Sequence, residues 1–368
     1  MPEIRLQSVT KIFGRKVEAV KDLSFIIEDG EYVSLIGPSG CGKTTTLRLL
    51  AGTILPSQGN IYFDDKSVVN LSIRDRNIGF VFQHFAIFPH LTVRENAAYG
   101  PRVRGRKKSE IDSLVDHALK AVQIDDKAEL YPQLLSAPDW QKIALARVIA
   151  SEAKILLLDE PLGALDQKIR EEFQIFLRDL VKKEGLTAIH VTHDQAEALT
   201  ISDKVAVMNK GRLVQLGSAS DLIFTPKNIF TSFFVGESDF LESVVINDKD
   251  NFAEVRVGRS TIKVKNMGIA KGKRVVVAVR REFFKIHKYA DKTETENLLP
   301  GIVVGDQFLG LLRRVRVKLE NQQIVEVKVH AKHPIRFKKN EKVKLEIDPS
   351  STRCFEYPEV GVASALEM

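Results

Sequence analysis

Cysteine, tryptophan and long apolar runs are scarce in this sequence of 368 residues, which contains two cysteines and one tryptophan. Two cysteines cannot form a disulfide framework, so we expect the chain to work in a reducing compartment. No stretch approaches the roughly 18 apolar residues of a membrane-spanning helix. The first residues also lack the apolar core of a signal peptide. We therefore expect any role at a membrane to come through a partner protein.

Charge gives little further guidance, because the formal net charge is only +7. This excess is compatible with nucleic acid, anionic lipid, nucleotide or a solvated basic surface as the partner. Length and a hydrophobic content of 44% predict two domains, or one large domain with an appendage.

A glycine-rich stretch marks the first candidate site, because it fits the pattern of glycine, four residues and Gly-Lys-Ser/Thr. Residues 32–36 predict a strand before it and residues 45–51 a helix after it. A loop between strand and helix directs backbone N–H groups at phosphate. We expect Lys43 to reach the β- and γ-phosphates of a nucleotide and the Thr44 hydroxyl to ligate Mg²⁺. The residues of the predicted phosphate loop are Gly37, Pro38, Ser39, Gly40, Cys41, Gly42, Lys43, Thr44 and Thr45.

Acidic residues form the second candidate cluster, where the apolar run 155–158 ends in Asp159 and Glu160. This pattern predicts a buried parallel strand whose carboxyl end opens into a ligand crevice. In that setting Asp159 would hold the Mg²⁺ shell and Glu160 would polarise the attacking water. A further predicted strand, 187–192, leads to His193 at the same edge, which favours a contact with the γ-phosphate.

Three other features are ambiguous when taken alone. Gln83 ends the apolar run 78–82, either as a satisfied strand terminus or as a ligand to metal or water. Phe13, beside Gly14, fits a core or loop aromatic better than a platform for a base. The basic run 102–108 is typical of a solvated approach to a helix, with a phosphate or lipid contact as the alternative. Residues 110–124 have helical spacing.

Beyond residue 236 the sequence changes to short β-prone runs separated by turn residues. They predict a small β-barrel-like domain. An oligonucleotide-binding face on such a barrel stays open, although the aromatic platforms that such faces use are not evident. The predicted strands are Glu242–Ile246, Ala253–Val257, Thr261–Val264, Arg274–Val279, Leu311–Leu319, Ile324–Val329 and Val343–Ile347.

In this order, the motifs resemble the nucleotide-binding subunits of ABC (ATP-binding cassette) transporters over residues 1–235. Val81-Phe82-Gln83 is similar to the Q-loop, Gly163–Asp166 to the D-loop and His193 to the switch histidine. The resemblance implies an α/β P-loop NTPase fold, an ABC cassette with antiparallel β and helical subdomains, the latter at about 84–150. Residues 236–368 would then form an all-β, OB-like regulatory barrel.

The resemblance also implies site roles and partners. Phe13 would stack on adenine, Gln83 would sense Mg²⁺ and the water, and ATP with Mg²⁺ would be the cofactor. The segment after Gln83 would dock a permease helix. Two transmembrane permease subunits and an extracytoplasmic solute-binding protein would be partners, at the cytoplasmic face of the cell membrane and without nucleic acid. A sugar is favoured as solute, with polyamine, iron or oxyanion as alternatives.

The sequence departs from the family at the signature, normally Leu-Ser-Gly-Gly-Gln, which here reads Leu135-Ser136-Ala137-Pro138-Asp139. In the family each signature closes over the triphosphate of the facing subunit, and Ser136 would contribute there. Ala137 adds a Cβ, Pro138 removes an N–H donor, and we expect Asp139 to bring a carboxylate near the γ-phosphate. These changes favour a heterodimer with a second ATPase over a homodimer.

Two other functions compete with this interpretation. A nucleic-acid or translation ATPase of the same superfamily would use the barrel on RNA or DNA, but the chain has one cassette and no cysteine-rich zinc element. In a regulatory ATPase, residues 236–368 would instead sense a small molecule.

Overall fold

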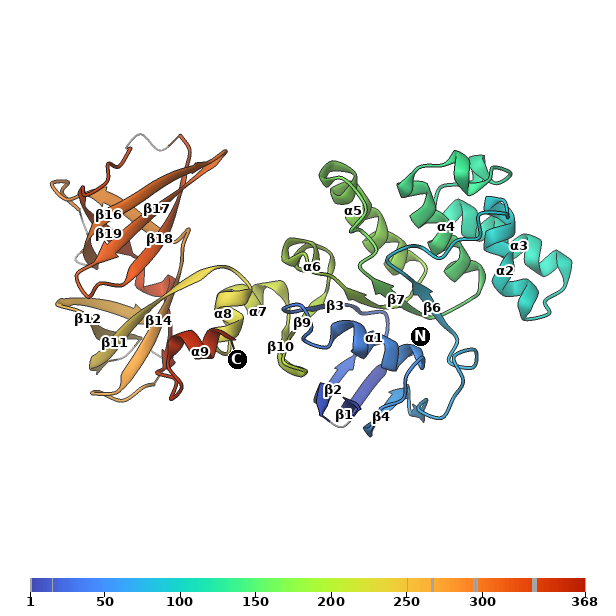
Figure 1. Ribbon diagram of the computed structural model, residues 1–368, viewed down its shortest axis with the longest axis horizontal. Helices are drawn as coiled ribbons and strands as arrows, with labels where there is room; N and C mark the ends of the chain where they lie inside the picture. The colour runs from blue at the N-terminus through green and yellow to red at the C-terminus, as the bar shows by residue number, and fades with distance from the viewer. Residues whose placement is uncertain are drawn as a thin grey trace. The chain divides into compact units, whose positions relative to one another are not determined.

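The computed structural model describes residues 2–14, 16–249, 251–265, 268–293, 295, 297–332 and 336–367. They form two compact units, one ending at Ala219 and the other beginning at Ser220. The first unit mixes helices and strands, whereas strands dominate the second (Figure 1). The units therefore meet earlier in the chain than the predicted boundary between residues 235 and 236.

A six-stranded sheet lies at the centre of the first unit, with the strand order β10-β9-β3-β8-β7-β6. Only β10 runs antiparallel to its neighbour. Every residue of β3 and β8 is buried, as expected for apolar strands covered on both faces. The strands are β3 (Tyr32–Ile36), β6 (Ile78–Val81), β7 (Ile155–Asp159), β8 (Thr187–Val191), β9 (Lys204–Asn209) and β10 (Arg212–Gly217).

A second sheet of the first unit is antiparallel, with the order β2-β1-β4-β5. Its apolar face shares a buried core with the helix after the glycine-rich loop and with β3. This sheet confirms the antiparallel β subdomain that the resemblance implies. Its strands are β1 (Ile4–Phe13), β2 (Val17–Ile27), β4 (Gln58–Phe63) and β5 (Lys66–Ser67).

Helix α1 (Lys43–Ala51) follows the glycine-rich loop and lies between left-handed residues, Gly42 before it and Gly52 after it. The buried guanidinium of Arg76 donates to the carbonyls of Leu49, at 2.7 Å, and Leu50, at 2.8 Å. These bonds satisfy carbonyls that the end of a helix leaves without partners. Arg76 therefore fixes the end of α1 opposite the loop.

Helices α2, α3 and α4 contact one another and lie within the predicted helical subdomain of about 84–150. Thr92 and Glu95 form a capping box at the start of α2. Outside this subdomain, helix α5 follows β7 and helix α6 follows β8. The helical elements are α2 (Val93–Val103), α3 (Lys108–Ala121), η1 (Asp125–Lys127), η2 (Pro132–Leu134), α4 (Ala137–Ala150), α5 (Gln167–Lys183) and α6 (Gln195–Ile201).

The second unit contains two five-stranded antiparallel sheets, β13-β12-β11-β14-β20 and β15-β19-β16-β17-β18, around one apolar core. This arrangement confirms the predicted OB-like barrel. The strands are β11 (Ser238–Lys249), β12 (Phe252–Val257), β13 (Ser260–Lys265), β14 (Arg274–Arg280), β15 (Phe284–Lys288), β16 (Leu298–Leu309), β17 (Leu312–Leu319), β18 (Ile324–His330), β19 (Lys342–Ile347) and β20 (Arg353–Glu356).

Short helices accompany these sheets and explain why the second unit begins before residue 236. Helix α8 contacts both β11 and α9. Arg280 of β14 donates to the carbonyls of Ile223 and Val235. The segment ahead of the barrel thus packs with it. The helices are α7 (Ala219–Phe224), α8 (Ile229–Phe234), η3 (Pro349–Ser351) and α9 (Val362–Glu367).

Candidate functional site

The loop between β3 and α1 is held by the lysine at its end. Lys43 is buried, and its Nζ donates to the carbonyls of Gly37, at 2.8 Å, and Pro38, at 3.0 Å. A Cβ on Gly37 would lie 2.2 Å from the Met208 carbonyl oxygen, and Gly42 has a φ of +107°. Only glycine fits both positions, and a loop of this kind can direct backbone N–H groups at a phosphate.

Asp159, at the end of β7, accepts a hydrogen bond from the side chain of Thr44. Burial raises the pKa of Asp159, the neighbouring Glu160 raises it further, and Arg48 and Thr44 offset part of this effect. A carboxylate and a hydroxyl beside a phosphate loop suit Mg²⁺, which in nucleotide sites takes one or two protein oxygens together with phosphate oxygens.

The carboxylate of Glu160 brings together the three residues predicted to be catalytic. Its Oε1 lies 2.6 Å from Nε2 of His193, and its Oε2 accepts from Nε2 of Gln83 at 3.2 Å. The Glu160 N–H donates to the carbonyl of Val191, which ties the end of β7 to β8. The φ of Glu160 is +49°, a left-handed conformation that glycine tolerates better than glutamate. The side chains lie at one sheet edge, as the parallel strands predict.

A buried polar network supports the turn that carries His193, and sequence reasoning missed it. Nδ1 of His190 lies 3.1 Å from the Tyr32 hydroxyl, and Nε2 lies 3.1 Å from Oε1 of Glu197. The Thr192 hydroxyl donates to the other oxygen of Glu197 at 2.8 Å. Burial raises the pKa of Tyr32, and the charge of Glu197 adds to this effect. Alternation along 187–192 could have suggested an inward His190, but not its partner on α6.

Phe13 ends β1 with 43% of its surface exposed. Nζ of Lys11 lies 5.1 Å from the centre of its ring, a cation–π contact. The side chain is therefore outside the core and accessible to a flat ligand. Its stacking on adenine remains a prediction.

The signature segment differs from expectation at Asp139. Rather than facing outward as expected for a contact with phosphate, the carboxylate is mostly buried and turned toward its own helix, α4. Oδ2 accepts from the Ser136 hydroxyl at 2.8 Å and the Ser136 N–H at 3.3 Å, and Oδ1 accepts from Nζ of Lys127 at 2.8 Å. Burial alone would raise the pKa of Asp139, but bonds from Lys127 and Ser136 hold it below its usual range.

This arrangement has a simple cause. Asp139 is the third residue of α4, where an acidic side chain completes a capping box and interacts favourably with the helix dipole. Pro138 lies in the first turn, where its missing N–H costs no bond within the helix. The hydroxyl of Ser136, expected to meet a partner's nucleotide, is instead engaged within the subunit.

The segment similar to a D-loop leads into α5. Asp166 caps this helix by accepting from the N–H of Ile169 at 3.2 Å. Arg170, one turn later, pairs with Asp194 beside His193 at 3.5 Å. The segment similar to a D-loop and the turn that carries His193 are therefore connected through one ion pair, Arg170–Asp194.

A cavity of about 170 Å³ lies beside the strand that leads to Gln83. Phe85 and Ala86 both have positive φ angles, so the chain turns sharply there. Arg147 holds this turn by donating to the Ala86 carbonyl at 2.5 Å, while its guanidinium lies 4.5 Å from the centre of the Phe88 ring. The cavity is lined by residues of β6, α2, α4 and this turn, including Phe80, Phe82, Phe85, Tyr99 and Val148.

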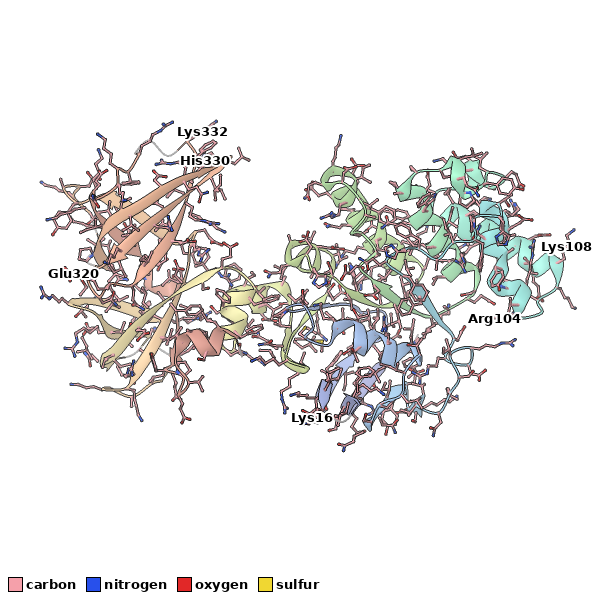
Figure 2. The ribbon with its side chains drawn as sticks, viewed as in Figure 1. Lys16, Arg104, Lys108, Glu320, His330 and Lys332 are labelled. Carbon is pink, nitrogen blue, oxygen red and sulfur yellow. The ribbon has the colours of Figure 1, made fainter. Side chains whose placement is uncertain are left out.

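The basic run 102–108 lies on the surface between α2 and α3. Arg106 pairs with Glu152 at 2.7 Å, and the side chain of Arg104 donates to the carbonyl of Ser151. Lys108, at the start of α3, is exposed (Figure 2). The solvated interpretation fits these contacts. Elsewhere, no helix in the described residues is long and apolar enough to cross a membrane.

Two protein families match the chain in the same order as its two compact units. The ABC transporter family matches residues 20–163, and the TOBE domain family matches residues 277–355. The first match spans the glycine-rich loop, Gln83, Asp159 and Glu160, and the second lies within the barrel.

Similar proteins extend this likeness over most of the chain. The spermidine/putrescine import ATP-binding protein PotA of Thermotoga maritima is 36% identical, over 90% of this chain and 91% of that protein. The Fe(3+) ions import ATP-binding protein FbpC of Fusobacterium nucleatum is 35% identical, over 99% of this chain and 95% of that protein.

Solved structures agree for the first unit. A dimeric ATP-binding cassette in a post-hydrolysis state, bound to ADP and Pi, has a TM-score of 0.52 and 30% identity, over 59% of this chain and 98% of that one. ABC ATPases bind ATP with Mg²⁺, and the loop, Thr44 and Asp159 described above fit both. The chain therefore belongs to the ABC transporter family, as an ATP-hydrolysing importer subunit with a C-terminal TOBE barrel.

Proposed function

We propose that Glu160 polarises the water that attacks ATP, with Gln83 and His193 orienting its carboxylate. The observation that carries this proposal is the convergence of both side chains on the two oxygens of Glu160. A carboxylate held from both sides presents a fixed lone pair to a water molecule. His193 is then placed beside the γ-phosphate as well as beside the base.

The remaining site residues bind the nucleotide. Gly37 to Thr45 surround the phosphates, Lys43 neutralises them, and Phe13 supports the adenine. Thr44 and Asp159, together with Gln83, would hold Mg²⁺, and the bound ion would neutralise charge on the transferring phosphoryl group. The raised pKa of Asp159 supports this role, because a cation beside a buried carboxylate offsets the cost of its burial.

The subunit works in an asymmetric pair with a second ATPase, and a homodimer is the alternative. Support comes from the signature, which offers a facing nucleotide neither the N–H of Pro138 nor a free Ser136 hydroxyl. A lost hydrogen bond to a charged group costs about 1.5–3 kcal/mol, so closure over that nucleotide weakens by about tenfold or more.

Two transmembrane permease subunits and an extracytoplasmic solute-binding protein complete the importer, with this chain peripheral at the cytoplasmic face. The cavity beside Phe82 and Phe85 supports permease docking, because it is partly apolar and is lined by Phe82, which directly precedes Gln83 in the chain. A movement of the Gln83 segment would displace a permease helix end that is inserted there.

The transported solute is a cation, either a polyamine or ferric iron. This proposal rests on the names of the two relatives above, which specify spermidine and putrescine or Fe(3+). The preference for a sugar finds no support in those relatives, nor does a nucleic-acid function. Because the ATPase subunit is not expected to contact the solute, only a transport measurement can distinguish a polyamine from ferric iron.

Transport by the whole complex tests the proposal. The chain is coexpressed with candidate permeases and a candidate binding protein from the same organism, purified and reconstituted in proteoliposomes with internal ATP. Uptake of labelled spermidine or Fe³⁺, lost in the Glu160→Gln complex, is expected. Uptake of maltose but of neither cation would overturn the solute assignment, and ATPase activity that ignores the permeases would overturn the coupling.

A further inference from the structure

The second unit contains a cavity of about 230 Å³ that is separate from the nucleotide site. Two arginines and four serines line it, and no acidic side chain does so. This volume is below the roughly 300–1,000 Å³ of clefts that take drug-sized ligands, so a nucleotide is too large. The lining residues are Ile223, Phe224, Pro226, Ser232, Ser238, Ala278, Arg280, Phe283, Ser350, Ser351 and Arg353.

Strand register places the polar groups on one face of a sheet. Arg353 of β20 lies opposite Ala278 of β14, and Ser238 of β11 lies opposite Arg280 of β14. Residues 278 and 280 are two apart on one strand, so their side chains point the same way. Arg280, Arg353 and Ser238 therefore share the sheet face that is turned away from the barrel core.

Both guanidinium groups are anchored but not saturated. Arg280 donates from Nε and Nη2 to the carbonyl of Ile223, at 3.1 and 2.5 Å, and from Nη1 to that of Val235, at 3.2 Å. Arg353 donates from Nε to the carbonyl of Phe224, at 2.5 Å. A guanidinium has five N–H donors, so each arginine retains donors for which the described residues provide no acceptor.

The positive charge in this cavity also lacks a counter-charge. No carboxylate of the described residues lies within ion-pair distance of Arg280 or Arg353. Glu282 acts on Arg280 only through space, and it is exposed. Two cations with partial burial and no anion carry an uncompensated desolvation cost. Burial accordingly lowers the pKa of both arginines.

Anchoring of the segment before the barrel explains only part of this arrangement. One arginine bonded to backbone carbonyls would hold that segment. Two arginines line the cavity, and each keeps N–H donors that these carbonyls do not use. Ser238 accepts from the Ser232 hydroxyl at 3.0 Å, so its own proton can be donated into the cavity. The cavity thus presents two guanidinium groups and a serine hydroxyl as donors, and no competing acid.

We propose that this cavity binds a small phosphate dianion, held by Arg280, Arg353 and Ser238. Two guanidinium forks match the charge and the oxygen geometry of phosphate. Phe224, Pro226 and Phe283 form an apolar wall, which admits a short organic group attached to the phosphate. Free phosphate and a small phosphorylated metabolite share this chemistry. The bound anion would join β14 and β20 to residues 223–235, which lead from the cassette into the barrel.

Calorimetric titration of the full-length chain with inorganic phosphate and with glycerol 3-phosphate tests this site. A saturating non-hydrolysable ATP analogue with Mg²⁺ keeps both probes out of the phosphate loop. We expect saturable binding, weakened about tenfold or more by Arg353→Gln and less by Arg353→Lys, since one charge-assisted contact is lost or made weaker. Arg256→Gln, which removes an exposed arginine of the same unit, is the matched control and should bind as the unaltered chain does.

The outcomes separate cleanly. Tighter binding of glycerol 3-phosphate supports a phosphorylated metabolite as the ligand, and tighter binding of inorganic phosphate supports the free anion. No saturable binding, or an equal loss in the Arg353→Gln and Arg256→Gln variants, overturns the site. Because the measurement needs neither hydrolysis nor a permease, its result is independent of the proposed transport function. Arg280 is left unchanged because its buried bonds make its loss a folding defect.

Discussion

Nε2 of His193 lies 2.6 Å from Oε1 of Glu160, so the ends of β7 and β8 are joined through side chains as well as through the backbone. Gln83 occupies the other oxygen of the same carboxylate. A water molecule that is to be polarised by Glu160 must therefore share one of these two oxygens. The predictions below follow from this site, its signature and the barrel.

Glu160→Gln should retain ATP binding and lose turnover by about 10²–10⁴-fold, since an amide cannot take a proton from water. Single-turnover hydrolysis and equilibrium nucleotide binding measure the two effects. Glu172→Gln, at an exposed position of α5, is the matched control. Turnover near the level of the unaltered chain would contradict the assigned role.

Lys43→Met should weaken ATP binding by about 10–100-fold, because a charge-assisted contact to phosphate is lost. The Gly37 and Pro38 carbonyls also lose their donor, so the empty loop should exchange its amide hydrogens faster. Hydrogen exchange and nucleotide titration measure these changes. Lys183→Met removes an exposed lysine and should alter neither.

Restoring the signature by Ala137→Gly, Pro138→Gly and Asp139→Gln together should raise the ATPase rate of the isolated subunit about tenfold or more. The change returns a backbone donor and frees the Ser136 hydroxyl from Asp139. Lys127→Ala alone, which removes one partner of Asp139 and leaves its bond with the Ser136 hydroxyl, should produce no such rise. High cooperative activity of the unaltered homodimer would refute the asymmetric pair.

The stability of the barrel should depend on pH through Asp239. Burial raises the pKa of this carboxyl to about 6, despite bonds from Glu326 and Arg281. Because the pKa is raised in the folded state, protonated Asp239 contributes to the free energy of unfolding. This contribution is fully present below the ordinary pKa of Asp, near 4, and is lost as pH rises through about 6. Between pH 4.5 and 7.5, the free energy of unfolding of the unaltered chain should therefore fall relative to that of Asp239→Asn, by roughly 2 kcal/mol.

Scanning calorimetry is the suitable measurement for Asp239, because the single tryptophan, Trp140, reports on the cassette and not on the barrel. Glu320→Gln, at an exposed carboxyl of the same unit, should show no such pH-dependent gain (Figure 2). A constant difference between Asp239→Asn and the unaltered chain at pH 4.5 and 7.5 would exclude Asp239 as the titrating group.

The convergence of Asp159, Glu160 and His193 could be predicted from sequence, because parallel strands present their carboxyl ends at one edge. The same reasoning could not find Glu197, whose partner His190 comes from another element. It also misjudged Asp139. The local pattern shows that Asp139 lies near a helix start, but Lys127, which neutralises it, comes from η1 and becomes a neighbour only in the folded chain.

In the barrel, the seven predicted strands are present, whereas β15, β16 and β20 were missed. Strand β16 contains Pro300, Gly301 and Gly305, residues that punctuate strands in sequence but are accommodated here at a bulge between Val303 and Gly305. Helix α2 was missed for a similar reason, because Gly100 and Pro101 lie near its end. The unit boundary depended on the packing of α7 and α8, which no local pattern reveals.

Because the backbone of Glu160 is left-handed, stability and activity favour different residues at this position. A glycine there would relieve about 1 kcal/mol of conformational strain. Selection or engineering for thermal stability alone would therefore favour replacing the one carboxylate that Gln83 and His193 hold. A stabilised descendant of this subunit would retain its nucleotide but hydrolyse it slowly, and could serve as the inactive ATPase of an asymmetric pair.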